Sequence, residues 1–533
     1  MGIALIIATP IFTILYQLSG PVSDTWRHLY DTVLADYVQN SLLLMGGTAL
    51  LAAAFGVLSA WLTAMYDFAG RRFFEWALIL PLAIPSYIAA YTYAGFLDYA
   101  GPLQVFMREA FDYRPAPGAL DIMHLPGAVL VLASVLYPYV YVTCRSAFLN
   151  QSVSLLEASR SLGAGGLRTF WRVALPVARP ALVGGLTLVV MEVLNDYGAV
   201  KYFGVPTFTT GIFRAWFSLG DQQSAIYLSS LLLLFVLGLI GLERWQRGKA
   251  RFHPRQSHHR PLRRQRPAAG LRLLYTILCA LPFVLGFVLP VGMLLYWAVI
   301  ASDKAFGANF LPLITNSFWL AGTAALLICA ISILLAYSRR IEKSRLIPLM
   351  TRVATSGYSI PGAVIAVGVL IPLLWLDKGI LIEVQKMLSG ARPSLLLTGS
   401  VFALLFAYHV RFLAVGFQPI EAGFTQIGQQ VTEVSQSLGA GKWRTLLRVN
   451  LPLLRRAVLG GMILVFVDVL KELPLTLILR PFNFSTLATR AYELAADELL
   501  EQSSGAALMI ILVGLIPVLF LNRIIRKSHD SHS

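Results

Sequence analysis

The chain has 533 residues, of which 57% are hydrophobic and only 13% are charged, and its mean hydropathy is +0.69. Because soluble domains carry about 25% charged residues, this composition excludes a single soluble core and indicates a chain embedded in a lipid bilayer. The net charge of +16 lies mostly in short segments between apolar runs, so we expect cytoplasmic loops and no nucleic-acid binding.

Apolar runs of about 20 residues predict twelve membrane-spanning helices. The predicted spans lie at about 3–18, 40–64, 74–98, 126–148, 178–198, 223–243, 272–300, 316–337, 346–376, 395–416, 456–480 and 505–525. Alternation of apolar and polar residues, as in a membrane barrel, is absent. The sequence therefore predicts an all-α polytopic membrane protein with about 12 transmembrane helices.

Lysine and arginine predict the orientation of the spans. Basic residues follow the second, fourth, eighth and twelfth spans and fill the segment between the sixth and seventh. Counted from an internal N-terminus, all of them fall on one side, which predicts that both termini are cytoplasmic. The N-terminal stretch lacks a basic region and a convincing cleavage site, so we interpret it as a retained span and not a signal peptide.

The chain repeats itself at an offset of 276 residues. Matching positions include Asn40 and Asn316, Ile84-Pro85 and Ile360-Pro361, and Gly184-Gly185 and Gly460-Gly461. Within 157–176, 13 of 20 residues are identical to their partners. Two halves with equal span counts form a parallel repeat that would enclose a central pathway. We therefore divide the chain into a first half, 1–245, a basic cytoplasmic linker, 246–270, and a second half, 271–533.

A duplicated loop follows the fourth and tenth spans, at 150–178 and 426–454. The first copy reads Glu157-Ala158-Ser159, three residues, Gly163, nine residues, Val173, one residue, Leu175-Pro176. The second copy has Glu433-Val434-Ser435, Gly439, Val449 and Leu451-Pro452 at the same spacing. Because glycine tolerates a left-handed helix end, we expect a helix before it and a second helix, from about Gly166 to Val173, that stops at the proline.

Both loops resemble the EAA loop of binding-protein-dependent ABC importer permeases, with serine for the second alanine and valine for isoleucine. The resemblance implies a MetI-like fold whose loops bind two copies of a cytoplasmic ABC ATPase. It also assigns the coupling residues, which are Glu157, Ala158, Gly163, Arg168, Leu175 and Pro176 in the first loop, and Glu433, Gly439, Arg444, Leu451 and Pro452 in the second.

The chain is not expected to hydrolyse ATP itself. A phosphate-binding loop needs GxxxxGK followed by serine or threonine, but Lys442 is followed by Trp443. We therefore predict a transport subunit without bound cofactors, whose partner ATPase uses ATP and magnesium.

Acidic residues inside predicted spans are the candidates for a substrate pathway, because ionisable groups are costly there. Glu192 and Asp196 in the fifth span, and Asp468 and Glu472 in the eleventh, are spaced i, i+4 and match at the 276-residue offset. Together with Tyr197 they supply oxygen ligands, which hard cations prefer. The alternative is that these acids pair with neighbours inside the membrane or lie at its outer interface. No permanent metal site is expected.

The segment from Met191 to Trp216 resembles the ferric-iron branch of the importer family, as does the fused two-half length. This resemblance implies that a periplasmic binding protein delivers Fe(III), which transiently meets the pathway carboxylates and crosses the bacterial inner membrane by alternating access. Fused permeases for thiamine and for aminoethylphosphonate are relatives, so another small solute remains an alternative. An ion-coupled secondary transporter is a distant one, because it would need no ATPase-binding loop.

Overall fold

Helices make up nearly all of the computed structural model, which describes residues 2–20, 22–116, 118–149, 159, 165–247, 264–308, 310–342, 344–389 and 395–530. Among these residues, the only β-type pairing is a single bridge between Tyr66 and Gln265. The predicted all-α fold is confirmed.

The α-helices have the following bounds: α1 Gly2–Gln17, α2 Asp24–Thr32, α3 Leu34–Met65, α4 Arg71–Ala77, α5 Ser86–Leu97, α6 Pro102–Phe111, α7 Leu125–Leu149, α9 Gly166–Thr169, α10 Leu175–Asn195, α11 Gly198–Tyr202, α12 Phe208–Phe213, α13 Gln222–Arg247, α14 Ala269–Phe283, α15 Leu289–Ile300, α16 Ser302–Ala305, α17 Phe310–Ile341, α18 Leu346–Ala354, α19 Gly362–Leu376, α20 Ile382–Ser389, α21 Val401–Ile427, α22 Gln430–Ser437, α23 Lys442–Thr445, α24 Leu451–Leu470, α25 Pro474–Leu479, α26 Leu487–Ala496 and α27 Leu500–Asp530. Short 3-10 helices cover Leu80–Ala83 and Thr355–Ser359, and π-helical turns cover Phe170–Ala174, Arg214–Ser218, Val284–Val288, Asp377–Leu381 and Leu446–Asn450.

In the described part of the chain, nine continuous helices are long and apolar enough to cross a membrane, and a bent pair makes a possible tenth. The chain is therefore a multi-pass membrane protein. The other two predicted spans correspond to α1, whose apolar stretch Ala4–Gln17 is shorter, and to α24, which contains Arg455, Arg456 and Asp468.

Two predicted spans, 74–98 and 346–376, are not single helices but are broken at their Ile-Pro pairs. The residue before a proline is pushed out of the helical region, and Ile84 and Ile360 have ψ angles of 114° and 133°. In the first copy, the helical segments on either side of the break differ in direction by 96°. Each proline then stands at the N-cap of the following helix, α5 or α19.

The helices pack into two compact units that do not coincide with the two sequence halves. Unit 1 comprises Met1–Thr32, Gly211–Leu233 and Asp303–Glu493, and unit 2 comprises Val33–Thr210, Leu234–Ser302 and Leu494–Ser533. Each unit thus combines the central helices of one half with terminal helices of the other. The predicted half boundaries follow the sequence repeat and stay a prediction.

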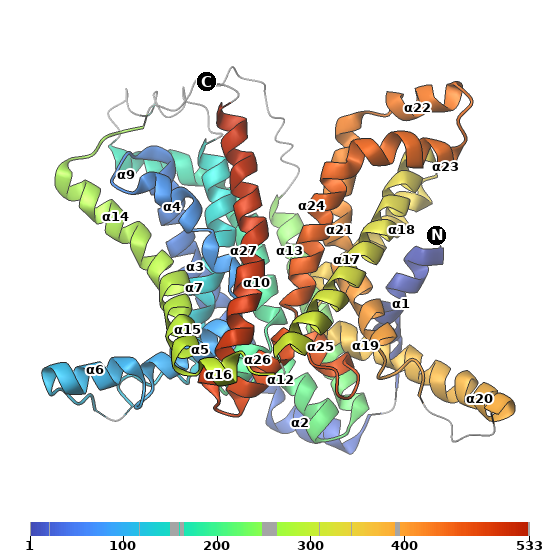
Figure 1. Ribbon diagram of the computed structural model, residues 1–533, viewed down its shortest axis with the longest axis horizontal. Coiled ribbons are helices and arrows are strands. Elements are labelled where there is room, and N and C mark those ends of the chain that lie inside the picture. Colours follow the sequence, from blue (N-terminus) through green and yellow to red (C-terminus); the bar gives the residue numbers. More distant parts are fainter. Residues whose placement is uncertain are drawn as a thin grey trace. The chain divides into compact units, whose positions relative to one another are not determined.

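In unit 1, helices α17, α21 and α24 pack together, and α1 lies against α18, α19 and α21 (Figure 1). A glycine permits the close approach of α1, because a Cβ atom at Gly368 of α19 would lie 2.6 Å from the carbonyl oxygen of Pro10. The first helix of the chain is therefore an integral part of this core.

In unit 2, helices α3, α7 and α10 pack together, and α15 lies against α5 and α27. Glycine again permits the contact, because a Cβ atom at Gly95 of α5 would lie 2.6 Å from the ring of Trp297 in α15. Since α1 and α14–α15 are at equivalent positions of the repeat, both units use the same arrangement.

Candidate functional site

The second coupling loop, residues 426–454, is a helical hairpin at one end of unit 1 (Figure 1). Helix α22 ends at Ser437, and Gly439 follows with a φ of +85°, the left-handed conformation that glycine adopts without strain. The amide of Gly439 donates to the Gln436 carbonyl over 3.0 Å. Helix α23 then begins at Lys442. The predicted helix end and turn at Gly439 are confirmed.

The predicted helix stop at the proline is wrong in both loops. Helix α23 continues through the π-helical turn Leu446–Asn450 into α24, and Pro452 lies in the first turn of α24. In the first loop, Phe170–Ala174 forms the same turn before Pro176 of α10. The five-residue hydrogen bond in each turn runs from the leucine before the proline, Leu175 to the Phe170 carbonyl and Leu451 to the Leu446 carbonyl, so the chain stays helical up to the proline.

A hydroxyl pair braces each coupling loop internally. In the second loop, Ser435 and Thr445 bring their hydroxyl oxygens within 3.0 Å, which ties α22 to α23. The equivalent residues of the first loop, Ser159 and Thr169, lie 3.1 Å apart. The two loops therefore share this link as well as their sequence motif.

The second loop is also anchored to the membrane helices behind it. The Arg340 guanidinium, on the last turns of α17, donates to the Thr432 hydroxyl over 2.8 Å and to the Phe424 carbonyl over 2.7 Å. The Tyr337 hydroxyl, one turn earlier, donates to the Lys442 carbonyl over 2.6 Å. These hydrogen bonds fasten the hairpin to α17 and α21.

The outer surface of the hairpin combines charge with exposed apolar side chains. Glu433 is exposed at the start of α22, and Leu438 and Trp443 are 82% and 67% exposed. An open groove beside them is lined by Gln430, Val431, Val434, Ser435, Leu438, Ala440, Arg444 and Val449. Exposed apolar patches with polar rims are typical of protein–protein contact sites.

The first loop presents a matching surface where the structure describes it. Leu167 and Trp171, at the positions equivalent to Trp443 and Leu447, are 75% and 61% exposed. Arg168 is exposed between them, as its counterpart Arg444 is in the second loop. The remaining predicted coupling residues divide into two groups: Leu175, Pro176, Leu451 and Pro452 open helices α10 and α24, and Glu157, Ala158 and Gly163 lie outside the described residues.

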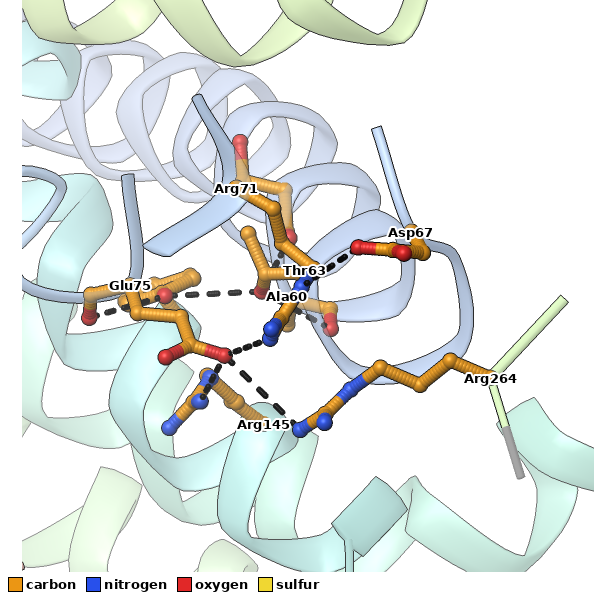
Figure 2. Close-up of polar contacts among 9 residues, drawn as sticks. Ala60, Thr63, Asp67, Arg71, Glu75, Arg145 and Arg264 are labelled. Atoms are coloured by element: carbon orange, nitrogen blue, oxygen red, sulfur yellow. Dashed lines mark hydrogen bonds and ion pairs between the residues drawn. The ribbon is translucent and has the colours of Figure 1, made fainter. Parts of the chain in front are cut away.

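A cluster of charged side chains, which sequence reasoning did not identify, joins α4, α7 and the linker within unit 2 (Figure 2). The Glu75 carboxylate pairs with Arg71, with Arg145 at 3.1 Å and with Arg264 at 3.8 Å. Arg71 also lies 3.4 Å from Asp67. Burial and the neighbouring Arg71 and Arg145 lower the pKa of Arg264. One carboxylate thus holds together three guanidinium groups from α4, α7 and the end of the linker.

The same cluster fixes the C-terminal end of the linker to the first half. Gln265 donates its amide to the Met65 carbonyl over 3.0 Å and accepts from the Asp67 amide over 2.8 Å. The neighbouring Tyr66 hydroxyl meets the first coupling loop, because a Cβ at Gly166 would lie 2.7 Å from it. The loop, the turn after α3 and the linker end therefore meet at one place.

Asp196, a predicted pathway residue, caps a helix. It lies just past the end of α10, is buried, and accepts hydrogen bonds from the backbone amides of Ala199 at 2.9 Å and Val200 at 3.1 Å. The Ser86 hydroxyl also donates to it. The carboxylate therefore starts α11 in the way that an N-cap aspartate does.

Glu472 does the same in the second half. Its carboxylate accepts from the amides of Leu475 at 3.1 Å and Thr476 at 3.0 Å at the start of α25. The position equivalent to Ser86 is Gly362, whose added Cβ would lie 2.8 Å from the Glu472 carboxylate and 2.7 Å from the Arg411 guanidinium. The two copies thus keep the capping carboxylate and differ in what surrounds it.

The other predicted pathway residues have different neighbours. Glu192 accepts a hydrogen bond from the Tyr139 hydroxyl over 3.4 Å, and Asp468 forms an ion pair with Lys471 at 2.9 Å. Tyr197 is buried next to Asp196. Glu192 and Asp196 lie in unit 2, and Asp468 and Glu472 lie in unit 1. Among the described residues, no group of three or more histidine, cysteine, aspartate or glutamate side chains could hold a metal ion.

The multi-pass helical fold and the repeated loop motif are features of transport permeases. The sequence profile of the family described as "Binding-protein-dependent transport system inner membrane component" matches residues 52–247 and 328–529. The chain therefore belongs to this family and contains its domain twice.

Curated relatives differ in the cargo that their names state. The chain is 27% identical over 501 residues to the Fe(3+)-transport system permease protein FbpB 2 of Haemophilus influenzae, covering 93% of this chain and 91% of that protein. It is 23% identical over 474 residues to the putative ferric transport system permease protein FbpB 1 of the same organism, covering 83% and 70%. It is also 28% identical over 204 residues to the sulfate transport system permease protein CysT of Salmonella typhimurium, covering 38% and 70%.

Proposed function

We propose that this chain is the permease of an ATP-driven importer that moves Fe(III) into the cytoplasm through the bacterial inner membrane. The observation that carries the proposal is the pair of coupling loops in a chain similar over 93% of its length to a ferric permease. The ferric permease matches both halves of the chain, whereas the sulfate permease matches 38% of it, so the shared two-half arrangement is what favours ferric iron.

Each coupling loop is the docking site of one copy of a separate cytoplasmic ABC ATPase. The exposed Glu433, Leu438 and Trp443 form the contact, and the ATPase supplies all of the ATP and magnesium chemistry. Because Arg340 and Tyr337 tie the hairpin to α17, closure of the ATPase dimer moves the membrane helices as a rigid body. With the loops in the cytoplasm, both termini are cytoplasmic as well.

The cargo arrives on a periplasmic binding protein and passes carboxylates that face the pathway. Fe(III) is a hard cation that prefers oxygen ligands. Glu192 and Asp468 are the leading candidates, because they occupy equivalent positions and neither caps a helix. Asp196, Tyr197 and Glu472 remain pathway candidates, although hydrogen bonds to helix N-termini give the two acids a structural role. Thiamine, also a cation, is the alternative cargo.

Uptake into proteoliposomes tests the proposal. The chain is reconstituted with its ATPase and its binding protein, and entry of radiolabelled iron, thiamine and sulfate is compared with and without ATP. We expect ATP-dependent entry of iron alone, and loss of that entry when Glu433→Ala is combined with Leu438→Ala. ATP-dependent entry of thiamine or sulfate in place of iron would contradict Fe(III) as the cargo but not the assignment as an ATP-driven importer. Entry of iron without the ATPase would contradict the assignment as an ATP-driven importer.

A further inference from the structure

Helix α6 extends away from the body of unit 2 (Figure 1). None of its ten residues is buried. Phe106 and Phe111 are 57% and 69% exposed, and Tyr99 just before the helix is 71% exposed. Leu103, Phe106 and Ala110, spaced i, i+3, i+7, form one apolar stripe. Arg108 follows Phe106 by two residues and so leaves the helix on the other side, where its guanidinium lies over the Tyr99 ring, 4.3 Å from the ring centroid.

Helix α20 is the counterpart in unit 1, where it extends away from α19 at the end opposite to α22 and α23 (Figure 1). Ile380, Val384 and Met387 are 46%, 41% and 85% exposed and form one stripe at i, i+4, i+7. Lys386 pairs with Glu383 at 2.8 Å away from this stripe. The second helix is therefore amphipathic too, with its apolar side outward.

The repeat preserves this exposed apolar character although the sequences differ. At the 276-residue offset, Tyr99 corresponds to Trp375, which is 66% exposed, and Phe111 corresponds to Met387. Large apolar side chains that stay uncovered in both copies indicate an apolar medium around them. Tyrosine and tryptophan are the residues enriched where a bilayer meets water.

The occupant of these faces follows from how the helices are attached. Helix α6 is the last part of Ser86–Phe111, one arm of the bent pair, and is separated from α5 by residues 98–101. Helix α20 ends the run Gly362–Met387 and follows α19 after the π-helical turn Asp377–Leu381. Both amphipathic segments thus begin where a membrane helix ends, with a charged side and an apolar stripe, as interfacial helices have.

We infer that α6 and α20 lie in the membrane–water interface on the side opposite the coupling loops, with their apolar stripes in lipid. Each would hold the outer end of its own broken span at a fixed depth while the rest of its unit moves. The partner is the lipid surface itself, and neither the cargo nor the ATPase is required for the contact.

Depth-dependent fluorescence quenching tests this placement. The full chain carries a single engineered cysteine labelled with an environment-sensitive dye and is reconstituted in vesicles of phosphatidylethanolamine and phosphatidylglycerol. The three native cysteines, all buried, are first replaced by serine or alanine. The test positions are Phe106→Cys and Val384→Cys. The controls, Arg108→Cys and Lys386→Cys, each lie two residues further on and face the other side of the same helix.

We expect lipids with a nitroxide near the headgroup to quench the test positions at least three-fold more than the controls, and the test dyes to emit at shorter wavelength. Equal quenching of both sets would overturn the inference. Quenching that disappears when the binding protein is added would also overturn it, since that protein would then occupy the stripe. Iron uptake is not part of the readout, so a different cargo leaves the result unaffected.

Discussion

Removal of the Glu75 carboxylate is the sharpest test of how the linker is attached. Glu75→Ala leaves Arg71, Arg145 and Arg264 close together without the negative charge they share. Removing one partner of a buried ion pair costs about 3–5 kcal/mol, because the other charge stays buried. The side chain of Arg71 is only 10% exposed, whereas that of Glu75 is 26% exposed, and this partial exposure reduces the cost. We therefore expect Glu75→Ala to lower the local unfolding free energy by about 2–3 kcal/mol.

Hydrogen exchange measures this loss where the linker docks. The amides of Asp67 and Gln265 bond across the bridge and exchange only when it opens. Since about 1.4 kcal/mol corresponds to a factor of ten, both amides should exchange roughly 30- to 100-fold faster in Glu75→Ala. Tryptic cleavage at Arg264 should accelerate in parallel.

Glu421→Ala is the matched control, because Glu421 pairs with the single Arg339 and is 40% exposed. Pairs of this kind contribute about 0–1 kcal/mol, so the exchange of Asp67 and Gln265 should not change. If Glu75→Ala left both amides as protected as in the parent chain, the cluster would not be what fastens the linker, and this reasoning would be refuted.

Three other predictions concern the caps, the hairpin and a loop carboxylate. Asp196→Ala should lower the unfolding free energy by about 1–2 kcal/mol, as measured by thermal unfolding in detergent, because it removes a helix cap. Glu192→Gln should leave the stability unchanged and slow iron uptake. If Asp196→Ala melted at the same temperature as the parent chain, the capping role would be contradicted. Arg340→Lys should reduce co-purification of the ATPase, because lysine cannot bond the Thr432 hydroxyl and the Phe424 carbonyl in the same geometry, and full recovery would count against it. Partial burial alone would raise the pKa of Asp221, but hydrogen bonds from the Ser224 and Ser23 hydroxyls outweigh it and lower this pKa. The stabilisation by Asp221 is then complete above the unfolded pKa of about 3.9 and is lost as the pH falls through the lower folded value, so the melting temperature of Asp221→Asn should differ from the parent at pH 7 and approach it below about pH 4.

The features that sequence predicted well are those set by local chemistry. Hydropathy located the membrane helices, because about 20 apolar residues have no other stable environment. The turn at Gly439 followed from glycine's access to left-handed backbone. The internal repeat added a check, because an independent copy of the hairpin motif stood 276 residues away.

What the sequence did not predict depends on groups that come together only in the folded chain. Glu75 pairs with Arg264, which lies in the linker and is distant in the sequence. The equivalent of Glu75 in the second half is Thr351, so the internal repeat gave no indication of the cluster. The i, i+4 spacing predicts that Asp196 shares a helix face with Glu192. The helix ends at Asn195, however, and the Asp196 carboxylate accepts hydrogen bonds from the next helix. Pro176 and Pro452 do not end the helices before them, because π-helical turns carry the chain on into α10 and α24. These turns have no signature in the sequence, so the continuation could not be predicted.

The position of α1 sets an order of events during synthesis. Gly2–Gln17 leaves the ribosome hundreds of residues before the surface that receives it, on Gly362–Leu376, is made. At a synthesis rate of about 5–20 residues per second, α1 stays in the bilayer for roughly 20 to 70 s before the helix it packs against is made. Joining both halves in one polypeptide therefore supplies each copy of α1 with its partner α19 in a one-to-one ratio.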